Sequence, residues 1–413
     1  MSRISDLIQE LCPDGVPFRA LGDIAELQRG QGMPRAMLVS EGVGAVHYGD
    51  IYTQYGHATR HTINFISPGD AERLVKVYPG DVIVTNTSEN IEDVCSSLAW
   101  LGEGSIVTGG HSTVIRSQMD ASFVSYWFRS SEFAKLKRKL ATGTKVIEIT
   151  ANSLKKVRIP VPPIEVQREI VRILDQFTQL EAELEAELER RRLQFEHYRD
   201  SLMTFTEGGR WTTMGEVGYF FGGLTGKTKQ DFGRGQSKFI TYMDVFHHPG
   251  LQTGGSGDVL ILDREKQNLV HRGDVLFTGS SESREEVGLT AVILEEPETD
   301  TYLNSFCIGF RFNRPELFDL QFLKFLLRSS AVRRQLMRSA NGVTRINLSR
   351  VRLNSIRLPL IDVDEQRTIS QTLSALEQLT FGVTTGIPAE IAARRKQYEY
   401  YRDQLLTFKE LPA

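Results

Sequence analysis

The chain has 413 residues, of which 40% are hydrophobic and 24% charged, and its net charge is −3. This length allows two or three domains that each bury a core, and the absence of a run of about 18 apolar residues or of a signal-peptide layout favours a cytoplasmic protein without a membrane span. The slightly acidic charge excludes a chain that is basic throughout, so any contact with nucleic acid must use local patches or basic partners.

The first part of the chain, residues 1–160, has the pattern of a compact α+β domain. Short apolar runs such as 82–84 are bounded by Gly and Asn, as is typical of strands. Apolar residues with a helical period cover 123–140. We therefore expect one globular domain here, with residues 161–207 outside it.

A long helix is expected next. Pro162 and Pro163 end an extended stretch and suit the first turn of a helix. Apolar residues then recur every three or four positions, which predicts a coiled-coil seam. From Ile164 to Phe205 the helix would reach about 63 Å, which favours a helix partner over a helix lying on one domain. The seam consists of Ile170, Ile173, Phe177, Leu180, Leu184, Leu188, Phe195, Tyr198, Leu202 and Phe205.

The second half of the chain repeats the first. Pro79-Gly80-Asp81-Val82 recurs as Arg272-Gly273-Asp274-Val275, and RIPVPPIEVQREI at 158–170 recurs as RLPLIDVDEQRTI at 357–369. The order of the matches is kept while short insertions accumulate, which indicates a tandem duplication of a unit of about 200 residues. We thus expect a second α+β domain over 208–358.

A second long helix is expected over 359–413. Asp362 can cap it, with Glu365 three residues later in the spacing of a capping box. Near 382–388 the second copy has extra residues, among them Gly386 and Pro388, which favour an interruption of the helix. The predicted fold is α+β, with two tandem α/β domains separated by two long antiparallel coiled-coil helices in a pseudo-two-fold repeat.

Two similar but non-identical domains at a fixed distance suit a bipartite target. DNA presents the same groove face at half-sites about one turn (~34–36 Å) apart. Because the two domains differ in sequence, the two half-sites would differ as well.

The junction between the first domain and its helix carries a specific pattern. Gly143-Thr144-x-x-Ile147 is followed by Leu154-x-x-x-x-Ile159-Pro160-x-Pro162-Pro163-x-x-x-Gln167 and the long helix. With its second copy, this pattern resembles the specificity subunit of type I restriction-modification systems over essentially the whole chain. The second copy departs from it, with Asn341-Gly342-Val343 and Ile361-Asp362, so its helix can leave the domain at a different angle.

The resemblance implies a non-catalytic protein with two target recognition domains, which read the two halves of an asymmetric site in double-stranded DNA. It implies two methyltransferase subunits as partners, which use S-adenosylmethionine to methylate adenine. In the full complex it also implies ATP-dependent restriction subunits that translocate and cut DNA. We expect no cofactor, no metal and no membrane contact for this chain. The alternative is a scaffold of the same repeat that does not read DNA.

Motifs for independent catalysis are incomplete. The stretch from Phe221 to Thr228 ends like a phosphate-binding P-loop, but Phe221 stands where the pattern needs a glycine. The stretch 263–266 has the residue types of a nuclease but the pattern of a solvated turn. Cys12, Cys95 and Cys307 lack the paired spacing of a zinc site or a disulfide framework, so we interpret them as buried thiols.

Polar loops are the candidates for DNA contact, because base and phosphate recognition needs Arg, Lys, Asn, Gln, Ser and aromatic side chains. Both copies place small hydroxyl residues after the Gly-Asp strand, at 85–88 and 278–281, which favours binding loops over ordinary solvated ones. The candidates in the first domain are Arg29, Arg35, Tyr55, His57, Arg60, Thr85, Asn86, Ser88 and Lys145. Those in the second domain are Lys227, Lys229, Arg234, Lys238, Ser280, Ser281, Arg284, Asn341 and Arg345.

Overall fold

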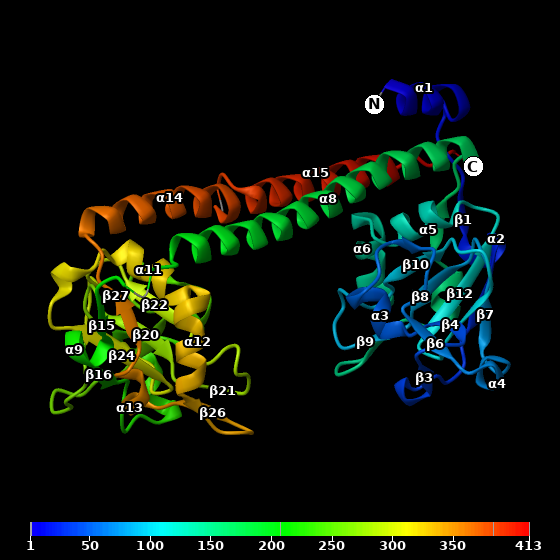
Figure 1. Ribbon diagram of the computed structural model, residues 1–413. Helices are drawn as coiled ribbons and strands as arrows, with labels where there is room; N and C mark the ends of the chain where they lie inside the picture. Colours follow the sequence, from blue (N-terminus) through cyan, green and yellow to red (C-terminus); the bar gives the residue numbers. More distant parts are fainter. Residues whose placement is uncertain (1, 207, 383, 413) are drawn as a thin grey trace. The chain divides into compact units, whose positions relative to one another are not determined.

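The computed structural model describes residues 2–206, 208–382 and 384–412 (Figure 1). The chain divides into two compact units, one formed by residues 1–184 with 391–413 and the other by residues 185–390. Each unit contains one α/β domain and two helical segments. Among the described residues, none of the helices combines the length and the apolar character needed to cross a membrane.

The first domain is built on a five-stranded central sheet. Its middle strand is buried along its whole length, because Val82, Ile83 and Val84 pack into the core. This strand runs antiparallel to both neighbours, whereas the last strand of the sheet runs parallel to its partner. The order is β2 (Ala25–Arg29), β12 (Ser112–Ser117), β8 (Val82–Thr85), β10 (Ser97–Trp100) and β5 (Ala58–Thr59).

A second five-stranded sheet and seven short helices complete this domain. The sheet order is β3 (Leu38–Val39), β6 (Asn64–Ile66), β4 (Val43–Val46), β11 (Ile106–Thr108) and β7 (Val75–Val77). Two further pairs are β1 (Phe18–Ala20) with β14 (Arg158–Pro160) and β9 (Thr87–Ser88) with β13 (Ile147–Glu148). The helices are α1 (Ser2–Leu11), α2 (Leu21–Ile24), α3 (Tyr48–Thr53), α4 (Pro68–Ala71), α5 (Ala121–Trp127), α6 (Ser131–Leu140) and α7 (Ala151–Lys155), with the 3-10 turn η1 (Arg35–Met37).

The second domain repeats the central sheet and varies the rest. The central order is β16 (Gly218–Gly222), β24 (Cys307–Phe312), β20 (Val275–Thr278), β22 (Thr290–Ile293) and β18 (Gly250–Leu251). One three-stranded sheet has the order β19 (Gly257–Val259), β17 (Phe232–Ile240), β23 (Thr301–Leu303). Another has the order β21 (Ser280–Ser281), β26 (Ile346–Leu348), β25 (Ala340–Asn341). In addition, β15 (Trp211–Thr213) pairs with β27 (Arg357–Pro359). The helical elements are α9 (Met214–Val217), η2 (Lys229–Asp231), α10 (Tyr242–His247), η3 (Pro315–Leu317), α11 (Leu320–Arg328), α12 (Ser330–Ser339) and α13 (Arg350–Leu353).

The two central sheets match strand for strand. In each, the middle strand is antiparallel to its neighbours and the last strand, β5 or β18, is parallel to its partner. In each, the first strand of the domain also pairs with the strand that leads into a long helix. The predicted duplication is therefore confirmed in three dimensions.

The long helices pack antiparallel within each unit (Figure 1). They are α8 (Ile164–Leu202), α14 (Val363–Phe381) and α15 (Ile387–Leu406). In the first unit, the ring of Phe177 on α8 stacks on Tyr401 of α15, with centroids 5.4 Å apart, and Glu181 accepts a hydrogen bond from Arg395. In the second unit, Phe195 of α8 meets Phe381 of α14 edge to face at 5.5 Å.

The predicted seam of α8 is wrong at three positions. Leu180, Tyr198 and Leu202 are 44%, 44% and 37% exposed, whereas Leu174, outside the predicted seam, is fully buried. A straight helix drifts away from a repeat of 3.5 residues over a length of 39 residues. In addition, Ile170 and Leu174 belong to the core of the first domain, so this end of the helix buries a face toward the domain as well as one toward α15.

The second helical region consists of two helices, α14 and α15. Asp362 caps α14 as predicted, although its side chain accepts the N–H of Asp364 rather than forming a capping box with Glu365. Residues 382–386 separate α14 from α15, and Val383 within the predicted interruption lies outside the described residues.

Candidate nucleic-acid interface

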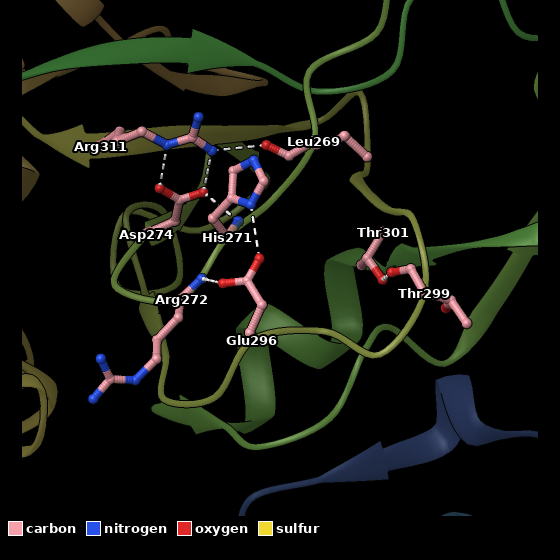
Figure 2. Close-up of polar contacts among 8 residues, drawn as sticks. All are labelled: Leu269, His271, Arg272, Asp274, Glu296, Thr299, Thr301 and Arg311. Carbon is pink, nitrogen blue, oxygen red and sulfur yellow. Dashed lines mark hydrogen bonds and ion pairs between the residues drawn. The ribbon is translucent and has the colours of Figure 1, made fainter.

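The Gly-Asp turn of the second domain holds a buried ion pair (Figure 2). The carboxylate of Asp274 accepts two hydrogen bonds from Arg311, at 2.8 and 2.7 Å, and a third from the backbone N–H of His271. Arg311 also donates to the carbonyl of Leu269, and its pKa is raised by the hydrogen bonds to Asp274. This carboxylate is only 1% exposed, so it ties the turn to the central sheet and faces no ligand.

The first domain has the same arrangement. Asp81 accepts hydrogen bonds from the N–H of Tyr78 at 2.8 Å and from Arg116 at 3.1 Å, and Arg116 donates to the carbonyl of Lys76. Burial raises the pKa of Asp81, although both hydrogen bonds act in the opposite direction. The repeated Gly-Asp motif is therefore a structural anchor in both copies.

A buried glutamine joins each domain to the helix that follows it. Gln167 accepts the N–H of Asp120 at 2.8 Å and donates to the carbonyl of Pro162. Gln366 accepts the N–H of Asp319 at 2.9 Å and donates to the carbonyl of Ile361. The glutamine of the repeated junction motif thus fixes the first turn of each helix against its domain.

The repeated Tyr-Arg-Asp segment anchors the far ends of the helices. Asp403 of α15 accepts the N–H of Ser131 in the first unit. In the second unit, Asp200 of α8 accepts both the N–H and the hydroxyl of Ser330. Burial raises the pKa of Asp200, but the hydrogen bonds from Ser330 and Arg199 outweigh it and hold the pKa below its usual value. Each domain therefore receives a helix end through one carboxylate.

A further contact fixes α8 in the first unit. His57 stacks on the ring of Tyr126, with centroids 3.9 Å apart, and both side chains bind the carboxylate of Asp175 on α8, at 3.0 and 2.7 Å. His57 was predicted to contact DNA, but its imidazole is used for this contact with the helix.

Three loops gather on one face of the second domain. They are the segment that contains the two-residue strand β21, the residues just before β24, and the hairpin between β25 and β26. Arg345 in the hairpin donates from Nε to the hydroxyl of Ser280 at 2.8 Å, and its guanidinium lies over the ring of Phe306, 5.1 Å from the centroid. We call this set the reading face of the second domain. In Figure 1, β21 and β26 lie at the end of the domain away from α14.

The first domain has an equivalent face with other side chains. Strand β9 pairs with β13 in the same register, Thr87 opposite Glu148, as Ser280 stands opposite Asn347 in the second domain. His111, the residue just before β12, hydrogen-bonds the hydroxyl of Thr87 at 2.8 Å. At the position that corresponds to Arg345 stands Val146, which is 57% exposed.

The hairpin of each face depends on one glycine. Gly143 and Gly342 have φ angles of +99° and +115°. A Cβ at these positions would lie 2.0 Å from the carbonyl oxygen of Val146 and 2.1 Å from that of Arg345. Only glycine combines this backbone conformation with the close approach, so the repeated glycine shapes the hairpin.

The predicted DNA-binding residues of the first domain fall into four groups. Thr85, Asn86 and Ser88 are buried, and Asn86 bonds the carbonyl of Ile149, so these side chains hold the loop together. Tyr55, His57 and Arg60 lie near β5, away from the hairpin in sequence, and Tyr55 accepts the N–H of Ile63. Arg35 is exposed and pairs with Asp50. The members that the structure brings to the reading face are the exposed Lys145 and Arg29, which pairs with Glu148 at 3.1 Å.

In the second domain, the predicted residues divide between two sheets. The side chain of Lys227, in the P-loop-like stretch, is 5% exposed and bonds the carbonyl of Leu260 and the carboxylate of Glu265. Lys229, Arg234 and Lys238 lie on η2 and β17, where Lys238 pairs with Asp258. Arg284 is exposed after β21. The members on the reading face are Ser280, Ser281, Asn341 and Arg345.

Several residues of these faces were not predicted from the sequence. Phe306 and His111 stand in equivalent positions just before a central strand, and Asn347 and Arg350 line the hollow beside Arg345. Aligning the two copies around β12 and β24 would have found the first two, because the alignment pairs one aromatic ring with the other.

Metal binding has no support in the described part of the chain. No group of three or more His, Cys, Asp or Glu side chains is placed there to hold a metal ion. Burial raises the pKa of Cys95 and of Cys307 to about 12, and all three cysteines are free and buried.

Comparison with known proteins gives the family. Residues 13–190 and 211–393 each match the type I restriction modification DNA specificity domain. The specificity subunit of a type I restriction enzyme of Escherichia coli is 32% identical over 300 residues, which cover 69% of this chain and 70% of that protein. A putative type I specificity subunit of Haemophilus influenzae is 25% identical over 337 residues, 79% of this chain and 82% of that one.

A solved structure shows the same fold. A chain in a structure concerned with the assembly and conformational transition of the type I restriction-modification system superposes with a TM-score of 0.68 at 17% identity, covering 95% of this chain and 98% of that one. Two domains of this family, joined by long helices that pack together, account for nearly the whole molecule. The chain therefore belongs to the DNA specificity subunits of type I restriction-modification systems, which are non-catalytic components of those enzymes.

Proposed function

We propose that this specificity subunit reads an asymmetric, bipartite site in double-stranded DNA, one half-site through each domain. The observation that carries the proposal is the pair of reading faces, which share one backbone register but present Val146 and His111 in one domain and Arg345 and Phe306 in the other. Equal frameworks with unequal side chains are suited to two different half-sites. The recognition domains are residues 1–160 and 208–358, and the spacer helices are 161–207 and 359–413.

The exposed predicted residues would contact the DNA. Lys145 and Arg345 are the members at the tips of the two hairpins, and the exposed Arg35, Arg60, Lys229, Arg234 and Arg284 suit phosphate contacts. The buried Thr85, Asn86 and Ser88, together with Lys227, support their loops from within, whereas His57 supports α8 through Asp175. Because the net charge is −3, this chain alone would bind the DNA backbone weakly.

The long helices would recruit two methyltransferase subunits that modify adenine, and restriction subunits in the full complex. Large apolar side chains remain exposed on these helices, namely Leu180, Leu193, Tyr198, Leu379 and Tyr400. A contiguous patch of exposed apolar groups on a folded chain is typical of a protein interface, and these side chains are the candidates for such a patch. Partner subunits would then supply many of the contacts with the DNA phosphate backbone.

Mapping of adenine methylation tests the proposal. The chain is expressed with its methyltransferase partner, and the genome is sequenced for modified adenines; the expected result is one motif with two unequal halves. Replacing residues 208–358 with the second domain of another specificity subunit should change one half only. A change in both halves counts against separate reading, and a complete complex without any sequence-dependent binding indicates the scaffold alternative.

A further inference from the structure

We propose that Arg345 reads a guanine in the half-site of the second domain, with Phe306 and Ser280 as its positioning residues. This inference rests on the proposed function, because it assigns one base to a face that the proposal places on DNA. It concerns three side chains that meet from three different loops of one domain.

The guanidinium of Arg345 is held in place before any ligand arrives. Its Nε is engaged by the Ser280 hydroxyl at 2.8 Å, and one flat side lies over the ring of Phe306, which is itself 54% exposed. The hairpin that carries Arg345 is fixed by Gly342. An arginine that is already oriented loses less side-chain entropy on binding than a free one.

The two terminal nitrogens of Arg345 remain available. Neither donates to a protein group in the described part of the chain, and no carboxylate there forms an ion pair with this residue. By contrast, Arg311 of the same domain has its carboxylate partner, Asp274, and a carbonyl partner. An exposed guanidinium that is braced at Nε and open at its terminal nitrogens has the geometry for a pair of parallel acceptors.

The shape and chemistry of the surroundings favour a base edge. Arg345 lines two hollows of about 440 and 590 Å³. The first also contains the polar side chains of Asn347 and Arg350, and the second contains the carboxylates of Glu282 and Glu286. In the major groove, guanine presents O6 and N7 as two adjacent acceptors, and arginine matches them with two N–H groups. A phosphate contact would need neither the aromatic support nor the paired hollows.

The first domain has no arginine held by an aromatic ring at the equivalent hairpin position. Val146 occupies the position of Arg345, and His111 occupies that of Phe306. An apolar side chain cannot donate to guanine, so the reading of this guanine is confined to one half-site. The half-site of the first domain then serves as an internal control in every experiment.

Duplexes with modified guanines test the assignment in the assembled complex of this chain with its methyltransferase subunits. Each guanine in the second half-site is replaced in turn by 7-deazaguanine, which lacks the N7 acceptor. For the natural chain we expect one replacement to weaken binding about tenfold or more. For Arg345→Ala the same replacement should have no effect, whereas replacements in the first half-site behave alike for both proteins.

Further variants separate positioning from direct contact. Arg345→Lys keeps the charge but cannot form the parallel pair, so it should lose most of the sensitivity to 7-deazaguanine. Phe306→Leu should reduce the sensitivity and Phe306→Tyr should retain it. Arg264→Ala removes an exposed arginine outside the reading face and should leave sensitivity and affinity unchanged. Thermal melting of every variant checks that the fold is intact.

Two results would overturn the inference. One is an equal loss of affinity for all duplexes in Arg345→Ala with an unchanged methylation motif, which marks a phosphate contact. The other is a motif and an affinity that do not change at all. If the natural complex itself gives no bipartite motif, the proposed function has failed, and the inference falls with it for that separate reason.

Discussion

The two domains agree in their interiors and differ at their reading faces. The ion pairs Asp81–Arg116 and Asp274–Arg311 lie in equivalent turns of the two copies, and Gln167 and Gln366 lie at equivalent junctions. Likewise, Asp403 and Asp200 accept the N–H of equivalent serines, Ser131 and Ser330, at the start of a helix. At the hairpin, however, the exposed Val146 of one domain corresponds to Arg345 of the other. The buried polar residues that recur in these pairs are therefore structural, and residues that differ at matched surface positions are candidates for specificity.

The strongest test of this comparison removes the buried carboxylates. Asp274→Ala leaves Arg311, whose side chain is 31% exposed, without its carboxylate partner and should lower the free energy of unfolding of the second domain by about 2–3 kcal/mol. Asp81→Ala should do the same to the first domain. Hydrogen exchange of the central-sheet amides measures each domain separately. Arg314→Ala, which removes a pair that is 65% and 63% exposed, serves as the control and should cost less than about 1 kcal/mol.

A smaller effect is expected at the junction glutamines. Gln167→Ala and Gln366→Ala each leave a partly buried backbone N–H without its acceptor, which costs about 1–1.5 kcal/mol. The loss should appear as faster amide exchange at Asp120 in one variant and at Asp319 in the other. If either variant loosened both helix starts, the two junctions would not be independent, and the equivalence of the two copies would need revision.

The helix anchor of the second unit should respond to acid. The pKa of Asp200 is lowered in the folded chain, so its contribution to stability is complete above about pH 4 and is lost as the pH falls through the lowered value. Ser330→Ala removes the hydroxyl donor, which should raise this pKa and cost about 1 kcal/mol. Carboxyl NMR titration measures the pKa. An unchanged pKa in Ser330→Ala would show that the hydroxyl does not stabilise the carboxylate.

The smallest expected effect concerns thiol chemistry. Cys95 and Cys307 lie in the interiors of the two domains, and burial raises their pKa to about 12. Because the thiolate is the reactive form, neither should be alkylated in the native chain at pH 8. Mass spectrometry after iodoacetamide treatment measures this, with a urea-unfolded sample as the control. If only one of the two cysteines were alkylated rapidly, the interior of its domain would open to solvent more often than the interior of the other domain.

The sequence predicted the framework better than the site. The duplication, the long helices and the cap at Asp362 follow from periodicity and spacing, which the local backbone obeys. The inward direction of Thr85 and Asn86 does not follow, because a small polar residue at the end of a strand is equally compatible with solvent and with internal hydrogen bonds. The inward contact of Lys227 does not follow either, since a flexible side chain can lie in solvent or fold back onto Leu260.

Contacts between distant loops were beyond the sequence pattern. The meeting of Phe306, Ser280 and Arg345 depends on the register of β21 with β26, which no local motif encodes. The exposure of Leu180 depends on where α8 drifts relative to α15. Both are set by tertiary packing.

The hairpins held by Gly143 and Gly342 have a consequence for engineering. Their tips are open to solvent, and Val343 is 95% exposed, so few interior atoms depend on the identity of the tip residues. Randomised libraries at 343–345 and at 144–146 should accordingly retain their melting temperature in most members. New sequence preferences could be selected from such libraries while the glycine and the buried carboxylates stay untouched.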